Sequence, residues 1–218
     1  MHSTIRNFGG RAAWLCLFFV LTHCGPPRRA EWSLLTPEFE GAWRAAGISQ
    51  EGKVVIEDGE ITLHAGEPMT GVRFEAWTSA ALPVTRYVVE YEAMRVEGND
   101  FFGTVTFPVN DTHATLIVGG WGGTLVGVSS IDDMDASENS TRGNSFFENK
   151  RWHKVRIEVR EDDLRAWIDG RLFVNVSIRG RKVGLRVGEI SKCLPFGFTT
   201  YLTEARIRRA VIRRLESF

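Results

Sequence analysis

The chain has 218 residues, of which 27 are Lys or Arg, 27 are Asp or Glu and 43% are hydrophobic. This balance excludes disordered, collagen-like and disulfide-scaffold proteins. The formal net charge of zero leaves no basic footprint for a polyanion, so we expect no nucleic-acid partner. A chain of this length is sufficient for one domain with a sizeable core.

The N-terminus has the pattern of an export signal. Arg6 and Arg11 precede the apolar run 12–21, and Thr22-His23-Cys24-Gly25 follows it. The run is too short to span a membrane, for which about 20 residues are needed. We therefore interpret residues 1–23 as a signal peptide and expect an exported protein, in the periplasm or the cell envelope.

Cys24 is a candidate for lipidation. Leu21-Thr22-His23-Cys24 resembles a lipobox, although His23 stands where a small residue is expected, so ordinary cleavage nearby is the alternative. Lipidation would give a membrane anchor, with residues 24–31 as a tether and 32–218 as the folded domain. Without lipidation, Cys24 is a candidate disulfide partner for Cys193.

From Lys53 onward, apolar and polar residues alternate, as is typical of half-buried strands. Asp58-Gly59 and Asp169-Gly170 suit tight hairpin turns, because Asp-Gly accepts positive φ values. The strands that this pattern predicts are, in chain order, 54–57, 60–64, 86–96, 101–108, 114–118, 125–129, 152–160, 164–168, 171–178, 182–187, 196–202 and 204–215.

The last of these segments allows two interpretations. Ile207, Val211 and Leu215 repeat every four residues, as on a helix, but they also share one face of a strand. We choose the strand. Many short strands with turns between them and no alternating helices predict an all-β, antiparallel two-sheet sandwich.

Several motifs occur in a familiar order. They are Arg86-Tyr-Val-Val-Glu-Tyr-Glu92, Gly98-Asn-Asp100, Trp152-His-Lys-Val-Arg-Ile-Glu-Val159, Trp167-Ile-Asp-Gly170 and Ile207-Arg-Arg-Ala-Val-Ile-Arg213. In this order they resemble the bacterial 3-keto-disaccharide hydrolase domain, and the resemblance extends over residues 32–215. It implies a concanavalin-like jelly roll and activity on oxidised glycosides.

Glu90 and Glu92 are candidate catalytic residues. They lie two apart on one predicted strand, so both carboxylates point the same way and suit a division into acid and base. The alternative is a solvated strand face on which the two carboxylates pair with outward arginines such as Arg156 and Arg160.

Asp100 and His113 complete the candidate acid/base set. Asn99, Asp100 and His113 lie near predicted strand ends beside the glycine-rich bend, where amide, carboxylate and imidazole groups suit sugar hydroxyls. We therefore assign Asn99 to substrate binding. A turn formed by residues 98–100 is the plainer alternative.

Trp121 is a candidate for sugar stacking. Glycines flank it on both sides, so no bulky sequence neighbour covers the indole. The alternative is a core aromatic whose glycines allow close backbone approach.

Residues 133–139 are a candidate Ca²⁺ site. Oxygen-bearing side chains occur at alternate positions, namely Asp133, Asp135, Ser137 and Asn139, and hard cations prefer such ligands. The segment lacks the EF-hand pattern, and an acidic surface loop is the alternative.

These features predict an exported domain that engages carbohydrate. The leading interpretation is an enzyme acting on oxidised glycosides, with Glu90, Glu92, Asp100 and His113 as its acid/base groups. The alternatives are a non-catalytic sugar-binding module that uses Trp121 and a cell-surface interaction domain without a small ligand.

Overall fold

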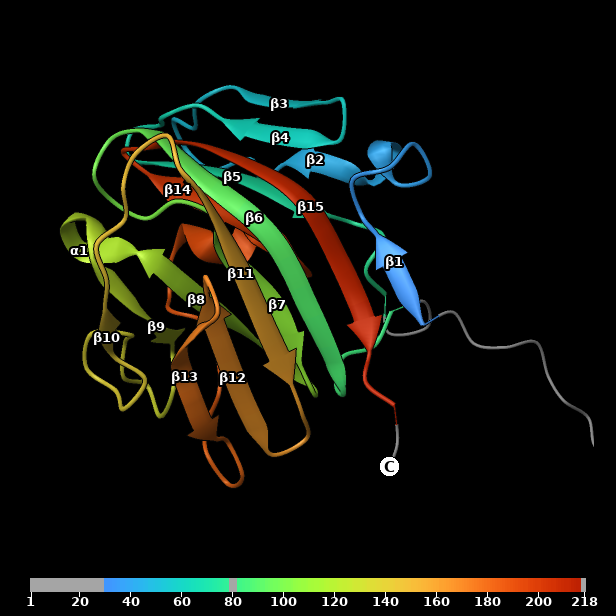
Figure 1. The fold of residues 1–218 in the computed structure, drawn as a ribbon, viewed down its shortest axis with the longest axis vertical. Coiled ribbons are helices and arrows are strands. Elements are labelled where there is room, and N and C mark those ends of the chain that lie inside the picture. The colour runs from blue at the N-terminus through green and yellow to red at the C-terminus, as the bar shows by residue number, and fades with distance from the viewer. Residues whose placement is uncertain (1–29, 79–81, 217–218) are drawn as a thin grey trace, which may run out of the picture.

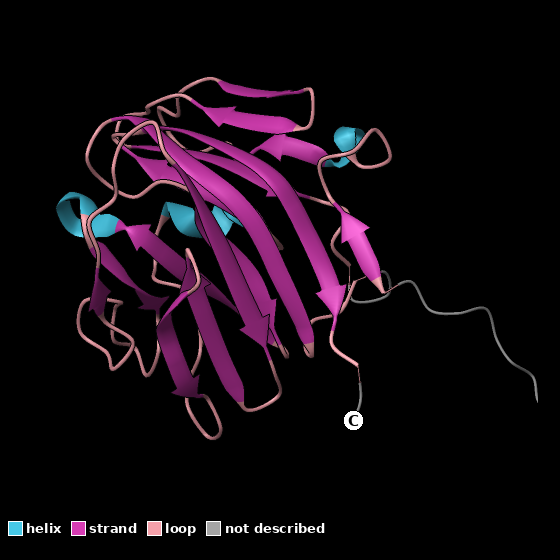
Figure 2. Cartoon of the chain, viewed as in Figure 1, coloured by secondary structure: helices cyan, strands magenta, loops and turns pink. Residues whose placement is uncertain are grey.

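The structure is a computed structural model that describes residues 30–78 and 82–216. Within these residues strands are the main regular structure, and loops connect them (Figure 2). Its helical elements there are α1 (Gly120–Gly123) and the 3₁₀ turns η1 (Glu40–Ala42) and η2 (Glu189–Cys193). None of these helices is long and apolar enough to cross a membrane. The predicted signal peptide, and Cys24 with it, lie outside the described residues.

The described strands form two antiparallel sheets, which lie face to face in Figure 1. Sheet A has the order β13 (Arg171–Ser177), β12 (Asp163–Ile168), β11 (Trp152–Val159), β6 (Tyr87–Glu97), β15 (Glu204–Arg214), β4 (Glu60–Leu63) and β3 (Val54–Glu57), with β1 (Glu31–Ser33) paired to β15. Sheet B has the order β10 (Gly143–Asn144), β9 (Leu125–Ser129), β8 (Thr112–Gly119), β7 (Thr104–Val109), β14 (Gly197–Tyr201), β5 (Met69–Phe74) and β2 (Trp43–Ala45). The predicted sandwich is confirmed.

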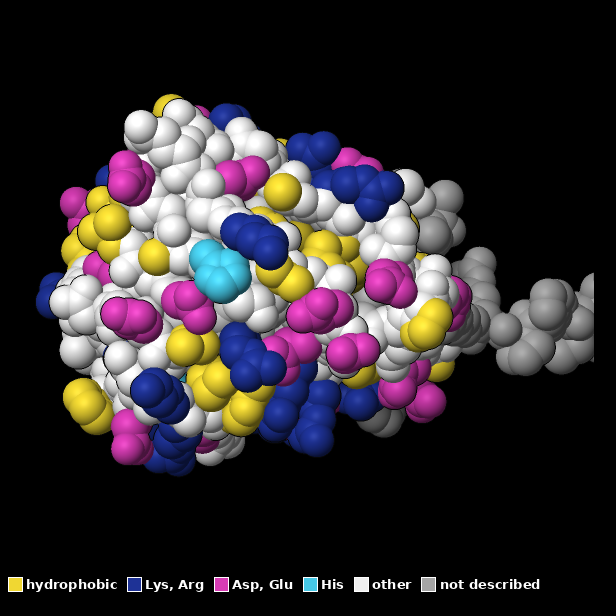
Figure 3. Space-filling view, turned by 90° about the horizontal axis from the view of Figure 1, so that it is seen from above, with side chains coloured by type: hydrophobic (Ala, Val, Ile, Leu, Met, Phe, Trp, Pro, Cys, Tyr) yellow, Lys and Arg dark blue, Asp and Glu magenta, His cyan; other side chains and the backbone are white. Residues whose placement is uncertain are grey.

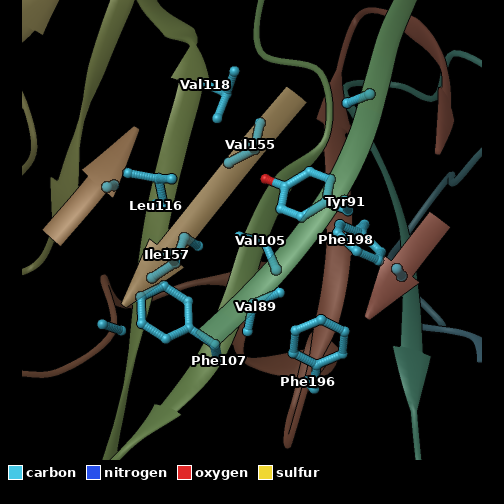
Figure 4. Close-up of a cluster of buried hydrophobic side chains, with 14 of the residues drawn as sticks. Val89, Tyr91, Val105, Phe107, Leu116, Val118, Val155, Ile157, Phe196 and Phe198 are labelled. Atoms are coloured by element: carbon cyan, nitrogen blue, oxygen red, sulfur yellow. The ribbon is translucent and has the colours of Figure 1, made fainter. Parts of the chain in front are cut away.

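The core lies between the sheets because each strand turns alternate side chains toward it. On β6, Tyr87, Val89, Tyr91 and Ala93 are at most 1% exposed, as the alternation predicts. These side chains meet others from sheet B, among them Val105, Leu116 and Phe198 (Figure 4). Aromatic rings fill the centre: the Phe198 ring stacks on Trp43 at 6.0 Å and meets the Tyr91 ring edge-on at 4.9 Å.

For two strands, the prediction of which side chains face the core is wrong, in each case because the strand pairing contains an irregularity. The register of β15 against β6 shifts between Arg208 and Val211, and Arg209 has a φ of 54°. This bulge reverses the alternation, so that Ala210 and Ile212 face the core in place of Val211. A similar shift in the pairing of β12 with β13 leaves Leu172 46% exposed, although regular alternation with the buried Val174 and Val176 would place it on the core face.

Two further predictions fail on strand position. Residues 182–187 do not form a strand: Val183 makes one isolated bridge to Ile131, and Ser130 and Gly184 exchange one pair of backbone hydrogen bonds. In contrast, the pattern missed β5, because Gly71 and Arg73 interrupt its apolar residues. At Gly71 a Cβ atom would lie 2.8 Å from the Ile48 side chain, so close packing on the outer side explains the glycine.

Candidate functional site

Two adjoining cavities lie over the outer face of sheet B, and together we call them the groove. The main cavity has a volume of about 430 Å³, and the polar cavity beside it about 560 Å³. Both are in the range of small-molecule sites, roughly 300–1,000 Å³. They share Trp121, Asp135, Arg186 and Val187 as lining residues.

Strand alternation supplies the floor of the main cavity. Leu116 and Val128 point into the core, so their neighbours Thr115 and Ser129 point outward. Thr115 is paired with Ser129 across β8 and β9, and its hydroxyl lies 3.0 Å from the Thr106 hydroxyl on β7. The floor is therefore polar at this level of the sheet.

Trp121 stands on a left-handed turn at one side of the groove. The φ angles of Gly119, Trp121 and Gly122 are 73°, 50° and 82°, so the short α1 segment does not have the backbone of a regular right-handed helix. The Asp100 Oδ2 atom accepts the Gly122 N–H at 2.9 Å, and its Oδ1 atom accepts the Phe101 N–H at 2.8 Å. The turn holds the indole outside the core, with Trp121 46% exposed.

Asp135 and Arg186 also line both cavities of the groove. The Asp135 Oδ1 atom accepts the Ser129 hydroxyl at 2.6 Å, and Arg186 Nη1 lies 2.6 Å from Asp135 Oδ2. The Arg186 guanidinium lies 5.9 Å from the centre of the Trp121 ring, within cation–π range. A chain of contacts thus joins Ser129 to the indole across the groove.

Arg95 supports the Asp100 side from below. It is 5% exposed, and its guanidinium donates to the Phe147 carbonyl at 2.5 Å, to Asn149 Oδ1 at 2.5 Å and to the Asp100 carbonyl at 3.4 Å. Burial lowers the pKa of Arg95, and the nearby Asp100 carboxylate opposes that change. Arg95 therefore fixes the backbone from which the Asp100 side chain reaches the Trp121 turn.

Glu90 and Glu92 lie elsewhere, on the outer face of sheet A. Glu90 accepts hydrogen bonds from Arg213 and Arg156, and Glu92 binds Arg208 at 2.7 Å and Arg209 at 2.8 Å. Burial raises the pKa of both carboxyls, but these arginine hydrogen bonds outweigh it and hold both pKa values below the usual 4.5. Figure 3 shows that basic and acidic side chains are also interspersed on another face of the molecule.

The structure also separates His113 and Asn99 from the cavity lining. His113 lies on the outer face of β8, two residues before Thr115, and is half-buried; burial lowers its pKa. Asn99 is exposed, and its carbonyl would lie 2.7 Å from a Cβ atom at Gly123. Asn99 thus adjoins the Trp121 turn through its backbone.

The predicted Ca²⁺ ligands are divided among other contacts. Lys182 pairs with Asp133 at 2.7 Å, and Arg186 with Asp135. The Asn139 amide donates to the Val128 carbonyl at 2.8 Å, while its Oδ1 atom accepts the Thr141 hydroxyl at 2.6 Å. In the part of the chain that the structure describes, no three His, Cys, Asp or Glu side chains gather as a metal site would require.

Sequence reasoning did not identify Arg186, Tyr201 or Arg95, although all three form or support the groove. Arg186 lies within residues 182–187, which the pattern predicts as a strand, and Tyr201 ends β14 with ordinary alternation. Cys193 carries a free thiol, 0% exposed, behind the groove wall, and burial raises its pKa to about 12.

Comparison with known proteins identifies relatives. Residues 33–191 match the family model of the 3-keto-alpha-glucoside-1,2-lyase-like domain. A search of curated proteins found no match.

Solved structures share the fold at low sequence identity. The carbohydrate-binding module CBM66 from Bacillus subtilis is 11% identical, with a TM-score of 0.52, covering 79% of this chain and 95% of that one. The Crh5 transglycosylase in complex with NAG is 10% identical, with a TM-score of 0.55, covering 87% of this chain and 86% of that one. These proteins confirm the jelly-roll architecture.

Proposed function

The chain belongs to the family of 3-keto-alpha-glucoside-1,2-lyase-like domains, and on that premise we propose that its groove binds and cleaves oxidised, 3-keto glycosides. The observation that carries the proposal is the exposed Trp121 indole, which lies in the groove beside two carboxylates and a guanidinium. An apolar ring face next to polar groups suits a pyranose, which presents C–H bonds on its faces and hydroxyls at its edge.

Arg186 supports the choice of an oxidised sugar. A ketone oxygen only accepts hydrogen bonds, and a guanidinium only donates them. The Arg186 side chain is 64% exposed beside Asp135, so N–H groups not used by that carboxylate face the groove. A ketone held by Arg186 would also make the neighbouring C–H bond more acidic.

Asp100 and Asp135 are the proposed acid/base groups. Both line the main cavity, together with Glu189, whose carboxylate is paired with Lys192 at 2.7 Å. One would take the proton from the carbon between the ketone and the anomeric carbon. The electron pair left on that carbon forms a double bond to the anomeric carbon, while the bond between the anomeric carbon and the leaving oxygen breaks. That oxygen then needs a proton, which the second group supplies.

The test is product release from a 3-keto-glucoside by purified protein. We expect release by the wild type and a loss of at least about 100-fold in kcat/KM for Asp135→Asn or Asp100→Asn. The matched control is the double variant Glu90→Gln/Glu92→Gln on sheet A, which should keep wild-type activity. Release that survives both groove variants and fails in the control would overturn the assignment.

A second function, sugar binding without cleavage, has a specific observation in its favour. Asp100 and Asp135 already accept hydrogen bonds at both carboxylate oxygens, and no histidine lines the described groove. Fixed carboxylates of this kind suit hydroxyl recognition. Saturable binding of the same glycosides by calorimetry, with no product after long incubation, would establish this second function in place of the first.

We also propose that the protein is exported, with lipidation of Cys24 as one outcome. The support is the sequence pattern of residues 1–25. Mass spectrometry of the mature N-terminus in a bacterial host, with Cys24→Ser as the control, tests it. An intact N-terminus in the cytosolic fraction would contradict export.

A further inference from the structure

The two cavities of the groove differ in chemistry. The polar cavity is lined by hydroxyl and carboxylate groups, including Ser130, Asp133, Ser137 and Glu138. The main cavity continues from the shared residues into a region lined by apolar side chains. These are Met69, Phe101, Ile117, Ile190 and the ring of Tyr201. Tyr201 also carries a hydroxyl, and the Glu189 carboxylate, which is paired with Lys192, belongs to the same lining.

The apolar region is built from three parts of sheet B and one covering turn. Ile117 points outward from β8, two residues beyond Thr115, so the floor changes from hydroxyl to hydrocarbon along one strand. The Tyr201 N–H donates to the Phe101 carbonyl at 3.2 Å, and the two rings lie 5.6 Å apart with their planes tilted by 47°. Ile190, on η2, lines the cavity from the other side.

Packing fixes these apolar groups in place. Phe101 and Ile117 are 9% and 5% exposed and belong to one cluster with Leu125 and Ala136. Met69 and Tyr201 pack against that cluster from the edge of the cavity. The surface is therefore preformed, and binding a ligand there requires little further ordering of side chains.

We propose that the ligand is a glycoside with an apolar, ring-containing aglycone, the sugar lying in the polar cavity and against Trp121 and the aglycone on the Phe101–Tyr201 surface. This inference rests on the proposed function and names its substrate class. A second sugar at the apolar end would place hydroxyl groups against side chains that offer few partners, and unpaired hydroxyls are costly to bury. An aromatic ring loses no hydrogen bond there and meets two tilted rings.

The experiment compares two 3-keto-glucosides that differ only in the aglycone, phenyl against methyl. The readout is the ratio of their kcat/KM values, or of their Kd values if the sugar is bound and not cleaved. We expect the wild type to prefer the phenyl glucoside by roughly tenfold or more.

Variants locate that preference. Ile190→Ser and Tyr201→Thr should bring the ratio close to one, because the phenyl glucoside loses more kcat/KM, or more affinity, than the methyl glucoside. Leu202→Ser is the matched control, since Leu202 is 53% exposed and outside the cavity lining, and it should keep the wild-type ratio. Trp121→Ala should lower the kcat/KM, or the affinity, for both glucosides by the same factor.

The possible outcomes distinguish a failure of the aglycone assignment from a failure of the proposed function. Equal use of the two glucosides by the wild type overturns the aglycone assignment and leaves the proposed function standing. A phenyl preference that persists in both Ile190→Ser and Tyr201→Thr also overturns the assignment. If neither glucoside is bound or cleaved, the proposed function fails and this inference fails with it.

Discussion

The outer faces of the two sheets arise from the same strand alternation and differ in what covers them. On sheet A, charged residues of neighbouring strands neutralise one another, as Arg208 and Arg209 do with Glu92. On sheet B, the Trp121 turn and the segment that carries Arg186 lie over a floor that is polar at Thr115 and Ser129 and apolar at Ile117. Sheet A consequently presents a cavity lined by paired charges, and sheet B presents a groove whose lining includes the exposed Trp121 indole.

The difference shows that a pair of aligned carboxylates is weak evidence for catalysis by itself. Glu90 and Glu92 have the spacing of an acid/base pair, but each is held by two arginines. Asp100 and Asp135 come from loops far apart in sequence, and both reach a cavity with space for a ligand. Glu90 and Glu92 also line a cavity, of about 470 Å³, so the two arginines on each glutamate distinguish the two sets, and enclosure does not.

The largest effect on stability is expected from a substitution in the core that holds the two sheets together. Phe198 is fully buried between the sheets, so Phe198→Ala should lower the free energy of unfolding by about 4 kcal/mol. Urea denaturation measures this change. A loss below roughly 1 kcal/mol would mean that the sheets are not held together by this cluster.

A smaller effect, confined to the groove side, is expected from Arg95→Met. The change removes three hydrogen bonds from a buried guanidinium and leaves the Phe147 carbonyl without this donor, at a cost of about 3 kcal/mol. Glycoside binding should weaken as well, because Asp100 loses its support. Arg165→Met, on an exposed part of sheet A, is the control; equal behaviour of the two variants would contradict the positioning role.

The smallest effect concerns the charges of sheet A. Because the pKa values of Glu90 and Glu92 are lowered in the folded state, their stabilisation is complete above the ordinary value of 4.5 and is lost as the pH falls through the folded values. In the double variant Glu90→Gln/Glu92→Gln, the free energy of unfolding should therefore fall less below that pH than in the wild type, by about 1 kcal/mol. Thermal unfolding across this range measures it, and identical pH profiles would refute the assigned ion pairs.

The sequence was sufficient for the sandwich and for most strands, because alternation is a local property. It assigns Tyr91 to the core and Glu92 to the surface correctly. It does not reveal the bulge at Arg209, which depends on pairing with β6, or β5, whose Gly71 fits against Ile48 from another part of the chain.

The site was predictable in part for the same reason. The glycines around Trp121 indicate an uncovered indole, and the pattern marks Asp100 as an acid/base candidate, but it marks Asp135 only as a Ca²⁺ ligand. Which sheet a strand joins is a long-range property, so the pattern does not show that Glu90 is remote from Asp100. Arg186 carries no local signal, since its role depends on Asp135, fifty-one positions away.

The central claim is that a glycoside binds in the groove over sheet B. A crystal structure of the protein with a bound phenyl glucoside tests it most directly. We predict the sugar ring against the Trp121 indole, with hydroxyls near Asp135 and Arg186. A sugar bound over Glu90 and Glu92, with the groove empty, would contradict the claim.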